Sequence, residues 1–337
     1  MTGAGIRWGV LSTANIGRRA VNPAIQASGN GTLVSVASRD AGRAKAFALE
    51  HGIPRHEGSY EALLADGDVD AVYIPLPNSL HKAWSIKSAE AGKHVLCEKP
   101  LALNATECLE MHAAATANGT LLMEAFMYRF HPRTERLIAL AQSGSLGDLR
   151  SIRSTFTFKL LSADNIRLQP DLGGGALMDV GCYCVNVSRT LAGAEPVDVQ
   201  ARANRGPSGV DAELTGMLRF ASGLVAHFDC ALTMDRREFV EVAGTDASVT
   251  MESSFVPGTE GAVLVERRER VERRHEVPGD DQYRRMVEHF ADCALNRTPL
   301  RHTALEAAAN MRVIDALYRS ARRRGQTVRV SGTGATG

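Results

Sequence analysis

Short apolar runs alternate with segments of helical character over the first 126 residues of the chain. The runs are rich in β-branched residues, as expected of strands that are buried on both faces. They are residues 6–11 (IRWGVL), 32–38 (TLVSVAS), 70–75 (DAVYIP), 94–98 (HVLCE) and 120–126 (TLLMEAF). The helical segments between them are residues 16–28, 40–51, 79–91 and 104–118. Strands joined in this way by helices predict an α/β fold with a doubly wound parallel sheet.

The pattern changes after about residue 125. From residue 223 to 233, apolar side chains at every second position alternate with His227 and Asp229, which predicts a strand with one solvated face. Further β-like runs lie near residues 149–160, 197–204, 212–220, 238–243, 247–252, 262–266 and 271–277. This part of the chain is therefore expected to form an α+β domain with an open, mostly antiparallel sheet.

These patterns predict two domains, residues 1–125 and residues 126–330. A late helix over residues 303–324 begins with Thr303 and Glu306 as a capping box, and it is expected either in the second domain or packed back on the first. The polar, glycine-rich residues 331–337 are expected to be disordered.

Composition excludes several classes of protein. Lys and Arg total 39 and Asp and Glu total 38, so the 337-residue chain carries a formal net charge of +1, whereas nucleic-acid binders usually have a basic excess. We find no secretory signal and no run of ~18 apolar residues. The six cysteines are scattered, and Cys182 and Cys184 lack a second ligand pair, so reduced thiols and no metal site are expected. We expect a cytoplasmic protein without a nucleic-acid or membrane partner.

A turn of small residues follows the first predicted strand. In the segment GVLSTANIG (residues 9–17), Ser12, Ala14 and Gly17 stand at the three glycine positions of a dinucleotide-binding motif. Small residues let backbone N–H groups and a helix N-terminus approach a pyrophosphate. A plain strand–helix connection is the alternative, but the surrounding βαβ pattern favours a dinucleotide. The residues expected to bind it are Ser12, Thr13, Ala14, Asn15 and Ile16.

The second predicted strand ends at Ser38 and Arg39, with Arg43 one helical turn later. An NAD site usually has an acidic residue at this position, which binds the ribose 2′-hydroxyl. A hydroxyl and two guanidinium groups suit a 2′-phosphate instead, so the sequence favours NADP over NAD. The alternative is a simple helix start, with Asp40 as the N-cap and both arginines in solvent.

Four further segments carry a recognisable pattern. They are YIPLPNSLH (73–81), GKHVLCEKP (92–100), EAFMYRFHP (124–132) and GGGALMDVGCY (173–183). In this order and spacing they resemble the Gfo/Idh/MocA oxidoreductases, and the similarity extends from Ile6 to about Tyr318. The resemblance implies an N-terminal Rossmann domain, a C-terminal α/β domain whose open sheet often serves subunit association, and a substrate held between them against the nicotinamide.

The resemblance also implies two residues for the chemistry. Lys99 matches the family lysine at the end of a strand. Many members have Asp-x-x-x-His in the last motif, whereas here Asp179 is followed by Tyr183, as in the branch of glucose–fructose oxidoreductase, dimeric dihydrodiol dehydrogenase and sugar ketoreductases. An ammonium beside a phenol stabilises the phenolate and lowers a tyrosine pKa from ~10 toward neutrality. We expect Tyr183 to transfer the proton and Lys99 to tune it, or the reverse.

Other candidates have weaker support. Asp179 is expected one helical turn before Tyr183, where it binds a substrate hydroxyl or charges the helix start. Asn165 and Arg167 either reach the substrate or hold a loop, and His81 either lines the nicotinamide ribose or is a satisfied histidine at a helix start. The residues expected at the cofactor edge after the third and fourth strands are Leu76, Pro77, Asn78, His81, Glu98 and Lys99.

The leading hypothesis is an NADP-dependent oxidoreductase that transfers a hydride between nicotinamide and a carbinol or ketone carbon of a sugar or sugar-like cyclic diol. A second hypothesis is an NADPH-dependent ketoreductase of a nucleotide-linked keto sugar. A third, of another class, is a non-catalytic NADP-binding regulator, which would need neither Lys99 nor Tyr183. A homo-oligomer, a dimer or tetramer through the C-terminal sheet, is expected in each case.

Overall fold

The computed structural model describes residues 5–330 and divides the chain into two compact units. The first contains the chain up to Met127 together with Asp281–Ala308, and the second contains Tyr128–Asp280 and the chain from Ala309. The predicted boundary between residues 125 and 126 differs from this division, because a helix after Asp281 returns to the first unit, where its Phe290 ring lies 5.3 Å from that of Trp8. The predicted disordered tail, residues 331–337, lies outside the described residues.

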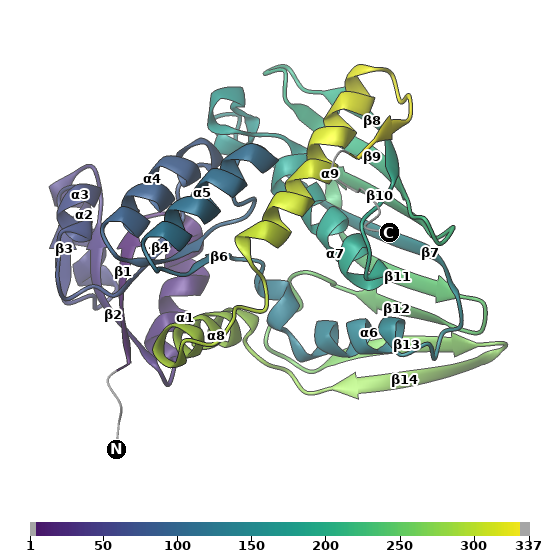
Figure 1. Ribbon diagram of the computed structural model, residues 1–337, viewed down its shortest axis with the longest axis horizontal. Coiled ribbons are helices and arrows are strands. Elements are labelled where there is room, and N and C mark those ends of the chain that lie inside the picture. Colours follow the sequence, from purple (N-terminus) through teal and green to yellow (C-terminus); the bar gives the residue numbers. More distant parts are fainter. Residues whose placement is uncertain (1–4, 331–337) are drawn as a thin grey trace. The chain divides into compact units, whose positions relative to one another are not determined.

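A six-stranded parallel sheet forms the centre of the first unit (Figure 1). Its order is β3-β2-β1-β4-β5-β6, that of the doubly wound dinucleotide-binding fold, so the predicted fold class is confirmed. The strands are β1 (Ile6–Leu11), β2 (Gly31–Ala37), β3 (Arg55–Glu57), β4 (Ala71–Ile74), β5 (His94–Cys97) and β6 (Leu122–Glu124). The helices are η1 (Gly17–Val21), α1 (Asn22–Ala27), α2 (Ala41–Glu50), α3 (Tyr60–Leu64), α4 (Asn78–Glu90), α5 (Ala105–Ala117) and α8 (Gln282–Asn296).

Side-chain caps begin several of these helices. Asn104 accepts a hydrogen bond from the backbone N–H of Glu107 over 2.9 Å at the start of α5. Gly119, with a φ of +64°, follows the end of the same helix. Local chemistry thus places the boundaries of the elements that carry the loops of the site.

A nine-stranded sheet forms the second unit (Figure 1). Its order is β14-β13-β12-β11-β7-β10-β9-β8-β15, and of these pairings only that of β10 with β7 is parallel. The strands are β7 (Leu149–Lys159), β8 (Asp198–Arg205), β9 (Asp211–Arg219), β10 (Val225–Ala231), β11 (Thr233–Gly244), β12 (Ser248–Glu252), β13 (Ala262–Arg268), β14 (Val271–Val277) and β15 (Val328–Arg329). The open, mostly antiparallel sheet is therefore confirmed.

Helices cover one face of this sheet, and the strand pattern follows from that. On β10, Ala226, Phe228 and Cys230 are buried while His227 is exposed. The helices are η2 (Met127–Phe130), which starts in the first unit, α6 (Pro132–Gln142), η3 (Ile166–Leu168), η4 (Pro170–Leu172), η5 (Leu177–Gly181) and α7 (Cys182–Ala192). The predicted late helix is α9 (Ala304–Arg322), which begins in the first unit and continues into the second. Within residues 5–330, no helix combines the length and hydrophobicity that a membrane span requires.

Candidate active site

The predicted cofactor residues of the first unit lie at one edge of its sheet. Because the strands are parallel, the loops after β1, β2, β4 and β5 all leave from the carboxyl edge. The strand order reverses between β1 and β4, and ligands of doubly wound sheets bind at such a point. The turn at Ser12 follows β1 and the turn at Leu76 follows β4, so both adjoin this point.

Ser12 adopts a backbone conformation that glycine normally takes. Its φ is +147°, and it directly follows β1. A side chain at such a φ is strained, which is consistent with a turn shaped for a ligand. Helical residues begin at Asn15 and continue through η1 into α1, so the backbone N–H groups of the first turn point to the region in front of Ser12. The structure thus gives the small-residue segment the strand–turn–helix context of a dinucleotide site.

The end of β2 has the cationic character predicted for a 2′-phosphate site. Arg39 is exposed and lies beside the Tyr60 phenol, whose pKa is raised by burial and lowered in part by this guanidinium. Asp40 does cap α2, because its Oδ1 accepts from the backbone N–H of Arg43 over 2.7 Å. The Asp40 carboxylate is therefore engaged at the helix start, and the exposed Arg39 lies in the same loop against Tyr60.

His81 is fully buried in the first turn of α4. Its Nδ1 lies 2.9 Å from the carbonyl oxygen of Pro100, and its Nε2 lies 2.8 Å from that of Leu76. Burial lowers the pKa of the imidazole. Both ring nitrogens therefore face backbone oxygens, and the neutral ring donates to one of them.

The segment that carries Lys99 is fixed by carboxylates on both sides. Glu98 accepts from the hydroxyl of the buried Tyr73 over 2.6 Å and from the backbone N–H of Lys99 over 3.3 Å. Two residues further on, the backbone N–H of Leu101 donates to the buried Glu124 over 2.8 Å. Lys99 itself is half-buried. Glu98, which the sequence analysis assigns to the cofactor edge, thus contacts protein atoms and holds the backbone beside Lys99.

In the second unit, the predicted substrate residues Arg167 and Asp179 form an ion pair. The Nε atom of Arg167 lies 2.6 Å from Oδ2 of Asp179. Asn165 caps η3, because its side chain accepts from the backbone N–H of Arg167 over 3.0 Å. The structure therefore brings together Arg167 and Asp179, and it places the Asn165 side chain at the N-cap of η3.

The glycine run before Asp179 is closely packed. A Cβ at Gly174 would lie 2.4 Å from the carbonyl oxygen of Arg167, and one at Gly175 would lie 2.2 Å from Oδ1 of Asp211. Asp211 is buried and accepts from the backbone N–H of Leu177 and from the hydroxyl of Tyr318, over 2.7 and 2.9 Å. The absence of a side chain at Gly175 therefore leaves room for the Asp211 carboxylate, which caps the next helical segment. The glycines thus have a packing role beyond that of a flexible turn.

Tyr183 is enclosed by aromatic rings. Only 4% of its surface is exposed, and the ring centroids of Tyr128, Phe156 and Phe255 lie 5.7, 5.3 and 5.2 Å from its own. Rings at such separations hold one another in place, which fixes the direction of the phenol. The predicted proton-transferring group thus sits on a rigid support of the second unit.

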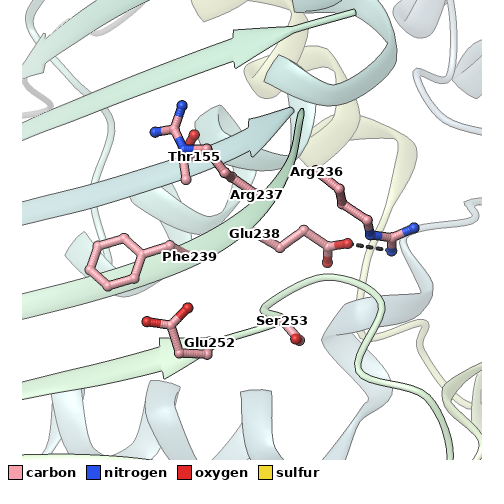
Figure 2. Close-up of a pocket in the computed structure, with 7 residues that line it drawn as sticks. All are labelled: Thr155, Arg236, Arg237, Glu238, Phe239, Glu252 and Ser253. Carbon is pink, nitrogen blue, oxygen red and sulfur yellow. Dashed lines mark hydrogen bonds and ion pairs between the residues drawn. The ribbon is translucent and has the colours of Figure 1, made fainter. Parts of the chain in front are cut away.

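Glu238 holds one of these rings. Its Oε2 accepts from the backbone N–H groups of Phe255 and Val256 over 3.0 and 2.8 Å, and Arg236 pairs with its other oxygen (Figure 2). Glu238 and Arg236 also line a cavity of about 450 Å³, together with Thr155, Arg237, Phe239, Glu252 and Ser253. Its second cation, Arg237, is paired with Asp229 over 3.0 Å, so this cavity has no unpaired guanidinium.

Asp179 and Tyr183 are not separated by a regular α-helical turn. Residues Leu177–Gly181 form a π-helical turn, and α7 starts only at Cys182. The predicted one-turn separation of Asp179 and Tyr183 therefore spans a π turn and the start of α7 instead of a regular α-helical turn. π turns occur often at functional sites, and η1 beside Ser12 is a second one.

Sequence patterns missed the residues that hold this site. Asp211, Tyr318, Phe255 and Glu238 lie 28 to 135 positions from Tyr183 in a chain where only local spacing was visible. Tyr60 beside Arg39 was also missed. A buried carboxylate or ring gives no local signal, since its partner is defined by the fold. Among the described residues, no group of three or more His, Cys, Asp or Glu side chains is arranged to hold a metal.

Comparison with known proteins identifies the family. The profile of an "Oxidoreductase family, NAD-binding Rossmann fold" matches residues 6–126, and that of the "GFO/IDH/MocA C-terminal domain" matches residues 134–250. The chain belongs to the Gfo/Idh/MocA oxidoreductase family. The resemblance inferred from the four motifs is thereby confirmed. The predictions that the protein is an enzyme and that it is an oxidoreductase are confirmed as well.

Three relatives of this Gfo/Idh/MocA protein illustrate the range. It is 42% identical to the "D-xylose 1-dehydrogenase (NADP(+)) 2" of Haloferax volcanii over 316 residues, 93% of this chain and 97% of the relative. It is 37% identical to the trans-1,2-dihydrobenzene-1,2-diol dehydrogenase of Bos taurus over 242 residues, 71% of this chain and 72% of the relative. The crystal structure of a 3-ketoreductase from Actinomadura kijaniata with NADP and TDP-benzene has a TM-score of 0.89 at 31% identity and covers 94% of this chain and 98% of that one.

Proposed function

We propose that this Gfo/Idh/MocA protein is an NADP-dependent oxidoreductase that transfers a hydride between nicotinamide and a carbinol or ketone carbon of a sugar or sugar-like cyclic diol. The observation that carries the proposal is the 42% identity, over nearly the full length of both chains, with a dehydrogenase named for D-xylose and NADP(+). The diol dehydrogenase and the NADP-bound ketoreductase widen the substrate class around the same chemistry. The cofactor and substrate class predicted from the sequence agree with these relatives.

The residues of the first unit fit this cofactor. The strained turn at Ser12 with the helix start behind it suits the pyrophosphate, and no acidic side chain other than the capping Asp40 stands at the end of β2. Ser38, Arg39 and Arg43 offer the hydroxyl and cations that a 2′-phosphate requires. Leu76, Pro77 and Asn78 are assigned to the nicotinamide end, because they follow β4 at the point where the strand order reverses.

The bound nicotinamide supplies or accepts the hydride. Tyr183 is assigned to move the proton of the reacting substrate oxygen, since its ring is rigidly held and a phenol can both donate and accept. Lys99 is assigned to stabilise the phenolate and to hold the substrate oxygen; the reverse assignment of the two groups uses the same chemistry. Asp179, oriented by Arg167, accepts a hydrogen bond from a neighbouring substrate hydroxyl.

A nucleotide-linked keto sugar is the second candidate substrate. The chain is 32% identical, over 94% of its length and 96% of the relative, to a dTDP-3,4-didehydro-2,6-dideoxy-alpha-D-glucose 3-reductase of Actinomadura kijaniata. This identity is lower than the 42% shared with the dehydrogenase named for D-xylose. A free sugar or diol is therefore preferred.

The test is a screen of reduced-nicotinamide absorbance against aldoses, inositols, dihydrodiols and nucleotide-linked keto sugars, with NADP and NAD. Turnover of an aldose or cyclic diol with NADP is expected, and turnover of nucleotide-linked sugars alone would select the second candidate. Lys99→Met removes the ammonium and should abolish turnover while NADPH still binds, and Lys82→Met, at a surface ion pair with Glu110, is the control. If no substrate turns over although NADPH binds, the non-catalytic regulator replaces the enzyme.

We also propose that the protein forms a dimer or tetramer through the face of the nine-stranded sheet that its helices leave open. The positions of β10 on that face, Val225, His227 and Asp229, are half-exposed or exposed and include both apolar and polar side chains, which supports an interface of moderate polarity. Light scattering on the purified chain tests it, and a monomer at all concentrations would refute it. The cytoplasmic location stays a prediction from the sequence.

A further inference from the structure

His81 joins two loops that have different tasks in the proposed function. Leu76, whose carbonyl oxygen faces Nε2, opens the turn assigned to the nicotinamide end. Pro100, whose carbonyl oxygen faces Nδ1, directly follows Lys99. All three residues lie in the first unit, and the imidazole lies between the two loops with one ring nitrogen facing each carbonyl oxygen. The neutral ring donates to one of these oxygens at a time.

The surroundings of the ring make this link rigid. The ring is fully buried, so water does not compete for either carbonyl oxygen. The backbone on both sides of Lys99 is already fixed, at Glu98 by the N–H of Glu98 donating to Ile74 over 3.1 Å and at Leu101 by Glu124. The carbonyl of Pro100 lies between these two anchors. A shift of the Leu76 turn is therefore transmitted to a backbone that has little freedom to yield.

We propose that His81 is a positioning residue that couples the cofactor turn after β4 to the backbone of Lys99, and that it contacts neither cofactor nor substrate. The proposal rests on the proposed function, because the tasks of the two loops come from it. The Leu76 contact sets how tightly the cofactor is held. The Pro100 contact sets the placement of Lys99 and hence the rate of the chemical step.

Two substitutions separate the two contacts. In His81→Asn, the side-chain amide reaches the position of Nδ1 and keeps a donor for Pro100, while the oxygen of Leu76 loses its partner. In His81→Gln, the amide reaches the position of Nε2 and keeps a donor for Leu76, while Pro100 loses its partner. The neutral ring has one N–H and can donate to either carbonyl oxygen, whereas each variant commits its donor to one of them and releases the other loop, which changes an equilibrium about 10-fold.

The experiment measures the Kd of NADPH by its fluorescence and the single-turnover rate at saturating NADPH. We expect His81→Asn to weaken NADPH about 10-fold with a nearly unchanged rate, and His81→Gln to slow the chemical step about 10-fold with a nearly unchanged Kd. Equal effects of both variants on both quantities, or none, would overturn the proposal. A reversed pattern would overturn the assignment of the loops.

Controls keep the outcome interpretable. His94→Asn is the matched control, because His94 accepts a backbone hydrogen bond from Leu121 at Nδ1 over 3.0 Å and lies at the start of β5, the opposite edge of the sheet. It should leave both quantities unchanged. If no substrate turns over in the wild-type chain, the proposed function fails, but the Kd of NADPH still separates the two variants. If His81→Gln raises this Kd as much as His81→Asn does, the proposed coupling is refuted.

Discussion

The Nε atom of Arg167 lies 2.6 Å from Oδ2 of Asp179, which joins two residues that stand twelve positions apart on either side of a glycine run. Asp179 is largely buried, with 13% of its side chain exposed, while the arginine remains partly in solvent. The pair turns a carboxylate at a helix start into an oriented acceptor. Arg167 and Asp179, which the sequence analysis considers separately, therefore form one ion pair.

Removing the carboxylate of this pair should weaken substrate use and spare the cofactor. Asp179→Asn is expected to lower kcat/KM about 10- to 100-fold, because a charge-assisted hydrogen bond to a substrate hydroxyl is lost. The Kd of NADPH should stay unchanged. Arg167→Gln should lower kcat/KM only a few-fold. Steady-state kinetics and NADPH fluorescence check this, and an equal loss of NADPH affinity in Asp179→Asn would contradict it.

Arg39 should decide between the two cofactors. Arg39→Ala removes a guanidinium assigned to the 2′-phosphate, so the Kd of NADPH should rise about 10- to 100-fold while that of NADH changes little. Tyr60→Phe, which removes the phenol oxygen beside Arg39, should produce a smaller change of the same sign. Arg150→Ala, at an exposed ion pair of the second unit, serves as the control. Equal weakening of both cofactors in Arg39→Ala would refute the assignment.

Gly175 should tolerate no side chain. Its φ is +127°, and an added Cβ would meet Asp211 at 2.2 Å, so Gly175→Ala should destabilise the protein by about 2 to 4 kcal/mol. Gly223→Ala isolates the backbone cost, because Gly223 has a φ of +88° with open space around its Cβ position. That variant should lose only about 1 to 2 kcal/mol. Urea unfolding measures both, and equal losses would show that Asp211 yields readily.

Asp211 should make stability depend on pH. Burial raises the pKa of its carboxyl, so between the ordinary Asp pKa of ~3.9 and the raised value the folded chain keeps a proton that the unfolded chain releases. The contribution of this group is therefore complete below the ordinary pKa and is lost as pH rises through the folded pKa. Asp211→Asn should remove this part of the slope.

The measurement is the urea midpoint of wild type and Asp211→Asn from about pH 4 to pH 7. The difference between the two proteins should change steadily in favour of the variant as pH rises. Glu276→Gln, on the exposed edge strand β14, should follow the wild type. Parallel curves for Asp211→Asn and wild type would show that the group ionises alike in both states.

Most elements of the first unit could be predicted because each has a local signal in the sequence, whereas the short β3 and α3 and the distant α8 were not predicted. A buried strand appears as an apolar run, and Asn104 and Gly119 mark the two ends of one helix. The turn at Ser12 was found by its position despite lacking glycine, since position after a strand and before a helix is itself a local signal. The order of strands then follows from the connections.

The supports of the site could not be predicted, because they depend on which distant segments meet. Asp211 bonds to Leu177 across 34 positions, and the ring of Phe255 reaches Tyr183 across 72. The role of His81 turned on the two carbonyls that the fold places beside it. A sequence motif can therefore identify the residues proposed to act in the chemistry, whereas the residues that hold them in place can be identified only from the fold.

The π turn at Leu177–Gly181 has a consequence for insertions and deletions. Such a turn contains one residue more than an α-helical turn needs, so the chain can lose a residue there and remain helical. That loss would change the position of Asp179 relative to Tyr183, both around and along the helix axis. A single-codon deletion here would thus move the carboxylate with respect to the phenol while both groups stay in the chain.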